Sequence, residues 1–122
     1  MQAFWAARAL LPEGWASEVR IALTQGRIAS VQTGVPAAIT DRRCDMLMPG
    51  LGNVHSHAFQ RGMAGLTEVG GRSGDSFWSW RKLMYRFVEQ LDPDSLQAIA
   101  EQAYVEMLES GFTRVGEFHY LH

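Results

Sequence analysis

The chain has 122 residues, of which 47% are hydrophobic and 20% are charged, and its formal net charge is −2. These values are typical of a single globular domain and exclude an intrinsically disordered chain. Because the basic residues are scattered along the chain, the charge pattern indicates neither a nucleic acid nor an anionic membrane as a partner.

The N-terminal residues give no sign of export. Residues 1–7 have no cationic region ahead of their apolar side chains, and no later stretch approaches the roughly 18 apolar residues needed to cross a bilayer. We therefore expect a cytoplasmic protein without a membrane partner. Cys44 is the single cysteine, which excludes an internal disulfide and a cysteine-rich zinc module and predicts a buried or idle thiol.

The first 48 residues have the pattern of short strands separated by turns. Segment 3–11 is apolar, and segments 18–24 and 27–33 alternate between apolar and polar residues. Gln25-Gly26 predicts the hairpin turn between the last two segments, with Gly26 at positive φ. Two or three strands with one apolar side are not stable alone, so we expect this incomplete β domain to pair with further polypeptide.

Residues 49–122 begin with a short apolar strand and a Gly-rich stretch over 62–74. That stretch is too polar and too flexible for a helix, and it fits either a mobile loop over an active site or a plain connector. Beyond it, apolar residues at three- and four-residue steps predict an amphipathic helix over 76–91, with Asp75 as its N-cap.

The boundaries of a second helix are marked by its capping residues. Asp92 is the expected N-cap, Pro93 occupies the first helical position, and Gly111 ends the helix. Residues 112–120 then predict a second strand, which a right-handed crossover would pair in parallel with the first. Since two parallel strands alone expose both edges, we expect a segment of a longer protein, at most the first quarter of a barrel of about 250 residues.

His55-Ser56-His57 follows Pro49-Gly50 and the short apolar strand. Residues two apart on a strand project from one face, so both imidazoles can converge on one ion, whereas on a helix they would point to nearly opposite sides. Hydrolytic metal sites use three or more protein ligands, so this pair predicts part of a site that later barrel strands complete. A bound metal lowers the pKa of water from about 15.7 toward about 7, which favours hydrolysis.

Residues 48–61, MPGLGNVHSHAFQR, resemble the first-strand signature of the amidohydrolase superfamily. More narrowly, the chain resembles the N-formimino-L-glutamate deiminases through HAFQRGMAGL at 57–66, FWSWR at 77–81 and GEFHYLH at 116–122. Together these matches span essentially all of residues 48–122, and a β-domain start is also expected of that family.

The resemblance implies an α/β fold in two parts. Residues 1–48 would be the N-terminal part of a small β-sandwich domain, and residues 49–122 the first strand, helices and second strand of an incomplete (β/α)8 barrel. It also implies one catalytic zinc ion and a homodimer. The implied reaction is hydrolysis of N-formimino-L-glutamate to N-formyl-L-glutamate and ammonia, a step of histidine degradation.

The resemblance also assigns roles to five residues. His55 and His57 would be metal ligands, and Gln60, Arg81 and Tyr120 would contact the substrate. Arginine suits a substrate with two carboxylates because its planar guanidinium binds a carboxylate through two hydrogen bonds, while the other two side chains offer neutral donors. The remaining ligands, a histidine and an aspartate, and the acid and base residues are expected downstream of the segment, which alone would be inactive.

Some of these residues also have a plainer interpretation. Gln60 is otherwise a polar loop residue, and Arg81 is a helical residue for which solvent exposure is ordinary. Tyr120 lies opposite Glu117 in a regular strand, so it reaches the barrel mouth only if the strand ends or bulges there. Further residues are interpreted as structural, with His119 and His122 left off the metal site and the aromatic cluster assigned to helix core: Phe77, Trp78 and Trp80.

Two other functions remain open. Another member of the superfamily, an aminohydrolase acting on a purine or pyrimidine ring, would share His55 and His57 but have less use for Arg81. A binding or assembly module without catalysis is a hypothesis of a different class. The small-molecule enzymes need the rest of their polypeptide, whereas the module would unfold cooperatively as an isolated chain.

Overall fold

The computed structural model describes residues 2–68 and 76–121. The chain divides into two compact units, Met1–Pro49 and Gly50–His122, which are treated separately below. The division falls beside Pro49, where the sequence pattern changes. Within the described ranges, no helix combines the length and the apolar character needed to cross a membrane.

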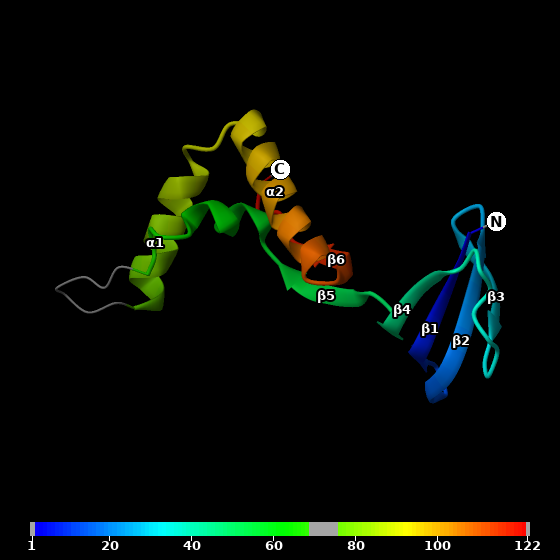
Figure 1. Ribbon diagram of the computed structural model, residues 1–122. Coiled ribbons are helices and arrows are strands. Elements are labelled where there is room, and N and C mark those ends of the chain that lie inside the picture. Colours follow the sequence, from blue (N-terminus) through cyan, green and yellow to red (C-terminus); the bar gives the residue numbers. More distant parts are fainter. Residues whose placement is uncertain (1, 69–75, 122) are drawn as a thin grey trace. The chain divides into compact units, whose positions relative to one another are not determined.

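The first unit is a four-stranded sheet with the order β3-β2-β1-β4 (Figure 1). Neighbouring strands are antiparallel for β1 with β2 and for β2 with β3, whereas β4 runs parallel to β1. The strand bounds are β1 Gln2–Leu11, β2 Gly14–Thr24, β3 Arg27–Gln32 and β4 Arg42–Leu47.

Three of these strands and one turn were predictable from local sequence. The predicted strands at 3–11, 18–24 and 27–33 are confirmed, and the turn between the last two has φ values of 50° at Gln25 and 73° at Gly26. The expectation of only two or three strands is wrong. β4 adds to the edge of the sheet through parallel pairing with β1, a long-range contact that its charged sequence RRCDML does not indicate.

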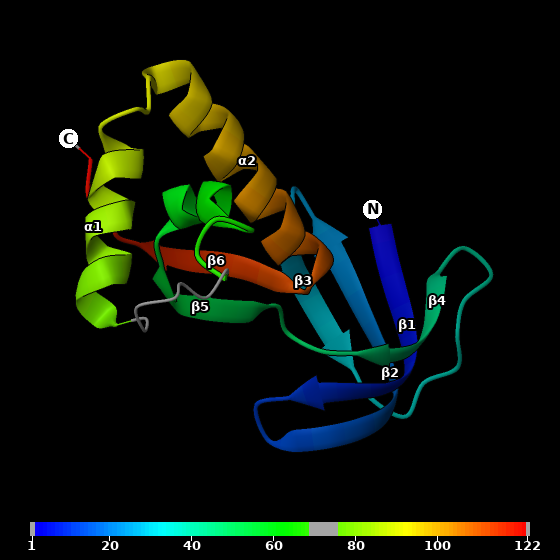
Figure 2. The same ribbon diagram turned by 90° about the vertical axis from the view of Figure 1, so that its left-hand side faces the viewer.

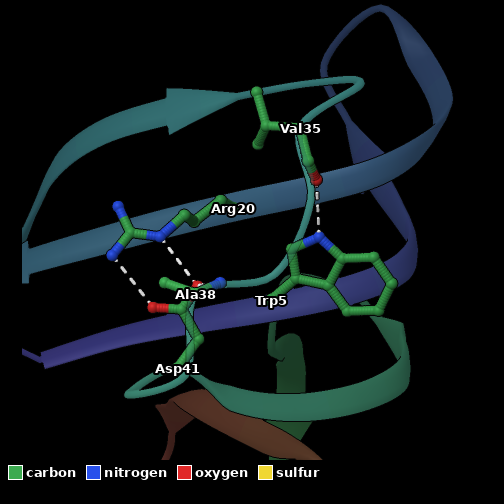
Figure 3. A network of polar contacts seen from close by, with 5 residues as sticks. All are labelled: Trp5, Arg20, Val35, Ala38 and Asp41. Atoms are coloured by element: carbon green, nitrogen blue, oxygen red, sulfur yellow. Dashed lines mark hydrogen bonds and ion pairs between the residues drawn. The ribbon is translucent and has the colours of Figure 1, made fainter.

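A polar network holds the loop between β3 and β4 against the sheet (Figure 3). The Arg20 guanidinium donates to both carboxylate oxygens of Asp41 at 2.8 and 2.9 Å, and the Ala38 backbone N–H donates to the same carboxylate at 2.8 Å. The Trp5 indole donates to the Val35 carbonyl at 2.7 Å. The hydrogen bond from Arg20 holds the pKa of Asp41 below its usual value. The Asp41 side chain is fully covered. Its hydrogen bonds therefore satisfy a buried carboxylate and stabilise the fold.

The second unit pairs β5 and β6 in parallel and connects them through three helices. The 3₁₀-helix η1 lies between α1 and α2 (Figure 2). The core of the second unit is formed by Phe59, Met63 and Met84. The bounds in chain order are β5 Leu51–Ser56, η1 Ala58–Met63, α1 Phe77–Val88, α2 Pro93–Glu109 and β6 Phe112–Glu117.

The helix boundaries follow from capping. In α2, the Asp92 carboxylate accepts from the Ser95 N–H at 2.7 Å, and Gly111 has a φ of 88° just beyond the helix, which confirms both predicted ends. In α1, the N-cap is Ser76, whose hydroxyl accepts from the Ser79 N–H while the Ser79 hydroxyl accepts from the Ser76 N–H. The prediction that Asp75 is the N-cap is therefore wrong. Asp75 itself lies outside the described residues. The α1 helix also ends at Val88, three residues earlier than predicted.

The start of the Gly-rich stretch is helical, which corrects the prediction of a loop from residue 62. Gly62 lies in η1, and a Cβ atom there would come within 2.7 Å of Phe87 and 2.8 Å of Ile99. Glycine is therefore needed for the close approach of η1 to the two helices, rather than for flexibility. The rest of the predicted loop falls largely on residues 69–75, which lie outside the described residues.

Candidate metal centre and substrate pocket

The two histidines of the H-x-H motif converge at the end of β5. His55 lies in the strand and His57 follows its last residue, Ser56. Their Nε2 atoms are 3.1 Å apart, and their ring centroids are separated by 4.9 Å with the planes inclined by 75°. The predicted convergence of the two imidazoles is therefore present in the structure.

The tautomer of His57 is set by a backbone carbonyl. Its Nδ1 atom is 3.0 Å from the carbonyl oxygen of Phe118, which can only accept a hydrogen bond. Nδ1 therefore carries the proton, and Nε2 presents its lone pair toward His55. Metal-binding histidines commonly have this arrangement, in which a carbonyl fixes the nitrogen that faces away from the ion.

The nitrogen separation fits a shared metal ion. Two nitrogen ligands about 2.0–2.1 Å from a tetrahedral ion lie roughly 3.3–3.4 Å from each other. The observed 3.1 Å between the Nε2 atoms of His55 and His57 is close to that value. Two histidines are an incomplete set, and no group of three or more histidine, cysteine, aspartate or glutamate side chains gathers within residues 2–68 and 76–121.

All five site residues predicted from the sequence line one pocket of about 460 Å³. The imidazoles form part of its wall, and α1 contributes residues from the helical face that carries Arg81. The complete lining is His55, His57, Gln60, Phe77, Trp80, Arg81, Met84, Tyr85 and Tyr120. The pocket therefore gathers residues from four sequence segments, although the structure alone leaves their individual roles as predictions.

Gln60 and Arg81 are held by neighbours within this pocket. The Gln60 amide donates to the sulfur of Met84 at 3.5 Å, which ties η1 to α1. The Arg81 guanidinium donates to the Tyr85 hydroxyl at 3.3 Å and lies over the rings of Trp78 and Tyr85 at 5.9 and 5.4 Å. Within the described residues, Arg81 forms no ion pair, so its charge stays available at the pocket wall.

Tyr120 reaches the pocket because β6 is shorter than predicted. The strand ends at Glu117 rather than continuing to residue 120, and Tyr120 has a φ of 62°. Its ring lies 4.8 Å from the His57 ring and 5.7 Å from the Phe59 ring, both edge to face. The turn beyond β6 thus removes the conflict that strict alternation predicted.

The aromatic residues of α1 do not all belong to the core. Phe77 and Trp80 line the pocket, and Trp80 also packs against the core beneath it. Trp78 is 65% exposed and lies outside the pocket lining. The assignment of all three to helix core is therefore wrong for Trp78 and for Phe77, which is 61% exposed, and incomplete for Trp80.

Sequence reasoning missed four contributors to this region. Tyr85 orients Arg81 from one helical turn away, a spacing that could have identified it. Met84 also lines the pocket. Its position on the apolar face of α1 predicts a core residue, so the sequence does not indicate a place in the pocket. The Phe118 carbonyl and the Glu117 carboxylate act through contacts about sixty residues apart in sequence, which no local pattern predicts.

Comparison with known proteins adds the family. Residues 46–122 match the family model described as the amidohydrolase family, and residues 1–45 match the one described as the N-terminal domain of formimidoylglutamate deiminase HutF. The chain belongs to the amidohydrolase family. Members of this family are generally metal-dependent, which agrees with the converging imidazoles of His55 and His57.

The amidohydrolase chain is similar to a fragment of longer proteins. It is 51% identical to a formimidoylglutamate deiminase of Pseudomonas aeruginosa, over 100% of this chain and 27% of that relative. It also matches the crystal structure of an amidohydrolase from Brucella melitensis with a TM-score of 0.93 and 54% identity, over 100% of this chain and 27% of that one. Its strands and helices therefore fit part of an amidohydrolase fold, while the barrel itself is not present in this segment.

Proposed function

We propose that this chain provides the first part of an enzyme that hydrolyses N-formimino-L-glutamate to N-formyl-L-glutamate and ammonia. One observation carries the proposal: a single pocket holds two converging imidazoles together with the guanidinium of Arg81, which forms no ion pair among the described residues. The name of the Pseudomonas aeruginosa relative, at 51% identity, supports this choice of substrate. The match of residues 1–45 to the HutF N-terminal domain agrees with it.

The proposed metal is one zinc ion held by His55 and His57. Neutral imidazole is a common zinc ligand, and the 3.1 Å between the two Nε2 atoms suits two ligands of one ion. When bound, such an ion supplies Lewis acidity and makes water a stronger nucleophile at neutral pH. The further ligands and the acid and base groups would come from the remainder of the polypeptide, so the 122-residue segment alone would be inactive.

The residues of this chain would bind and orient the substrate. Arg81 can grip a carboxylate of formiminoglutamate through two parallel hydrogen bonds, and Tyr85 holds its guanidinium toward the pocket. Gln60 and Tyr120 offer an amide and a hydroxyl to the polar groups of the substrate without adding charge beside the histidines. The departing nitrogen must be protonated by a group outside this segment.

The proposed setting is a (β/α)8 barrel with a small β-sandwich domain, in a cytoplasmic homodimer. The coverage of 27% of both relatives leaves ample chain to complete such a barrel. Exposed apolar side chains on the two-stranded sheet support this, since Val54 is 92% exposed and Val115 is 40% exposed. Further strands beside β5 and β6 would cover them.

The rival function is ring deamination. The rings of Phe77, Trp80 and Tyr85 line the pocket and offer faces on which a purine or pyrimidine could stack. Steady-state ammonia release by the complete zinc-loaded enzyme separates the two, with formiminoglutamate, guanine, cytosine and adenosine compared at equal concentration. We expect turnover of formiminoglutamate alone. Ring deamination without formiminoglutamate turnover would refute the proposal.

A non-catalytic module makes a different prediction. The isolated 122 residues would then show one cooperative thermal unfolding transition and bind no zinc stoichiometrically. An excised part of a barrel would instead unfold broadly or associate through its uncovered sheet. Calorimetry and sedimentation of the isolated chain distinguish these results.

A further inference from the structure

Two consecutive residues at the end of β6 contact His57 and both of its neighbours. The Phe118 N–H donates to the Ser56 carbonyl at 3.0 Å, and the Phe118 carbonyl accepts from His57 Nδ1 at 3.0 Å. The Glu117 carboxylate accepts from the Ala58 N–H at 2.8 Å through Oε1. The backbone before His57, its ring and the backbone after it are therefore all held from one strand end.

The contact from Glu117 is the one made by a side chain, so substitution can test it. The Ala58 N–H opens the 3₁₀-helix η1, where the first donors have no partner within the helix. Glu117 supplies that partner from the end of β6 through the carboxylate oxygen Oε1. Removing it would free the peptide that joins His57 to Ala58.

The Glu117 side chain is half-buried and lies near Tyr104 of α2. Its second oxygen, Oε2, is buried and has no hydrogen-bond partner among the described residues. Burial raises the pKa of the Tyr104 hydroxyl, and the charge of the nearby Glu117 raises that pKa further. The same carboxylate therefore lies close to Tyr104 of α2 and holds the Ala58 N–H of η1 through Oε1.

We propose that Glu117 is a positioning residue for His57. It fixes the peptide between His57 and Ala58, which keeps the imidazole against the Phe118 carbonyl and directs Nε2 toward His55. Glu117 itself contacts neither metal nor substrate. This inference rests on the proposed function, because the value of the fixed ring lies in holding a metal ion.

A second carboxylate that contacts η1, Glu106 of α2, provides a control. Glu106 forms a two-pronged ion pair with Arg61 of η1 at 2.7 and 2.8 Å, so it also tethers this helix to the rest of the unit. That ion pair is partly exposed and includes no atom of His57 or Ala58. Glu106→Gln should therefore leave the geometry of His57 unchanged.

The first test measures zinc affinity by chelator competition in the complete enzyme. Glu117→Gln keeps the length of the acceptor without its charge, whereas Glu117→Asp keeps the charge and shortens the reach. Positioning predicts that Glu117→Gln and Glu106→Gln bind zinc like the wild type, while Glu117→Asp binds about 10- to 100-fold more weakly, as for other loosened partners of metal ligands. The reverse order for the two Glu117 variants would show a role of charge and overturn the inference.

The second test needs no metal. Nitrogen-15 NMR of histidine-labelled, metal-free enzyme reports which ring nitrogen of His57 carries the proton. We expect the Nδ1–H tautomer alone in the wild type and in Glu117→Gln, and a mixture in Glu117→Asp. An unchanged tautomer and zinc affinity in Glu117→Asp, with only a lower melting temperature, would overturn the inference. A wild-type enzyme that binds no zinc would refute the metal centre, while the tautomers would still decide the role of Glu117.

Discussion

The two units use polar side chains in opposite ways. In the first, every contact of the Asp41 carboxylate is internal, because Arg20 and the Ala38 N–H occupy both of its oxygens. In the second, the Nε2 atoms of His55 and His57 face each other at 3.1 Å. Satisfied buried groups stabilise a fold, whereas two imidazoles that converge at the spacing of zinc ligands favour a binding role.

The hydrophobic cores of the two units also differ, both in the size of their side chains and in their contact with the proposed site. The first unit packs small side chains, with Ala6, Ala9 and Val19 at its centre, and this packing serves the sheet alone. The second unit buries Phe59, Met63 and Met84, and Met84 also lines the pocket beside the histidines. Met84 therefore belongs both to the core of the second unit and to the pocket wall, so packing and the proposed site share a residue.

The largest expected effect is a loss of catalytic efficiency on substitution of Arg81, with Arg20 of the first unit as the control. Arg81→Met in the complete enzyme should lower kcat/KM for formiminoglutamate roughly 30- to 5,000-fold, the range for removing one partner of a charged hydrogen-bonded pair. Its melting temperature should change little, because Arg81 is exposed and forms no ion pair within the described residues. Steady-state kinetics and thermal unfolding measure the two effects.

Arg20→Met is the matched control from the first unit. It should lower the melting temperature and leave kcat/KM unchanged, because it strands the covered carboxylate of Asp41, which belongs to the first unit and does not line the pocket. If both variants lost stability and neither lost turnover, the contrast between the units would be wrong.

Packing around η1 gives the next largest effect. Gly62→Ala should cost about 1–3 kcal/mol of stability, because the added methyl would overlap the side chains of Phe87 and Ile99. Ile99→Val removes one of the atoms in conflict, so the double variant should be less destabilised than the sum of the single variants. Denaturant unfolding of the four proteins measures this coupling, and strict additivity would contradict the packing account.

A smaller effect is expected at Tyr85. Tyr85→Phe removes the hydroxyl that accepts from Arg81 at 3.3 Å but keeps the ring beneath the guanidinium. The loss of one ordinary hydrogen bond should lower kcat/KM about 2- to 12-fold. The change should fall mainly on KM, and an unchanged KM would show that Tyr85 does not orient Arg81.

The smallest effect concerns acid stability. Hydrogen bonds from Arg61, and then from Gln102, lower the pKa of Glu106 from 4.5 to about 2. Its contribution to stability is therefore complete above pH 4.5 and is lost as the pH falls through about 2. Between pH 5 and pH 2 the wild type should lose slightly more stability than Glu106→Gln. Parallel pH dependences of the melting temperatures would contradict this.

Local chemistry explains which features could be predicted from the sequence. The ends of α2 depend on Asp92 and Gly111, whose side-chain and backbone preferences act over a few residues. The convergence of His55 and His57 follows from the two-residue period of a strand. At these positions the signal and the structure lie within one turn or one strand, and the prediction is confirmed, whereas the equally local prediction of Asp75 as the N-cap of α1 is wrong.

Long-range contacts explain what could not be predicted. β4 is a strand because it pairs with β1, and η1 is helical because α1 and α2 pack against it at Gly62. The end of β6 depends on the contacts that residues 117–120 make around the His57 ring. The five pocket residues were therefore predictable as candidates, whereas the contacts that position them were not.

The central claim is that His55 and His57 hold one metal ion together. The most direct test is the zinc content of the complete enzyme, measured by mass spectrometry for the wild type and for the double variant His55→Ala/His57→Ala purified in parallel. The account predicts about one zinc per chain in the wild type and almost none in the double variant, with loss of formiminoglutamate turnover. Full zinc content and turnover in the double variant would contradict it.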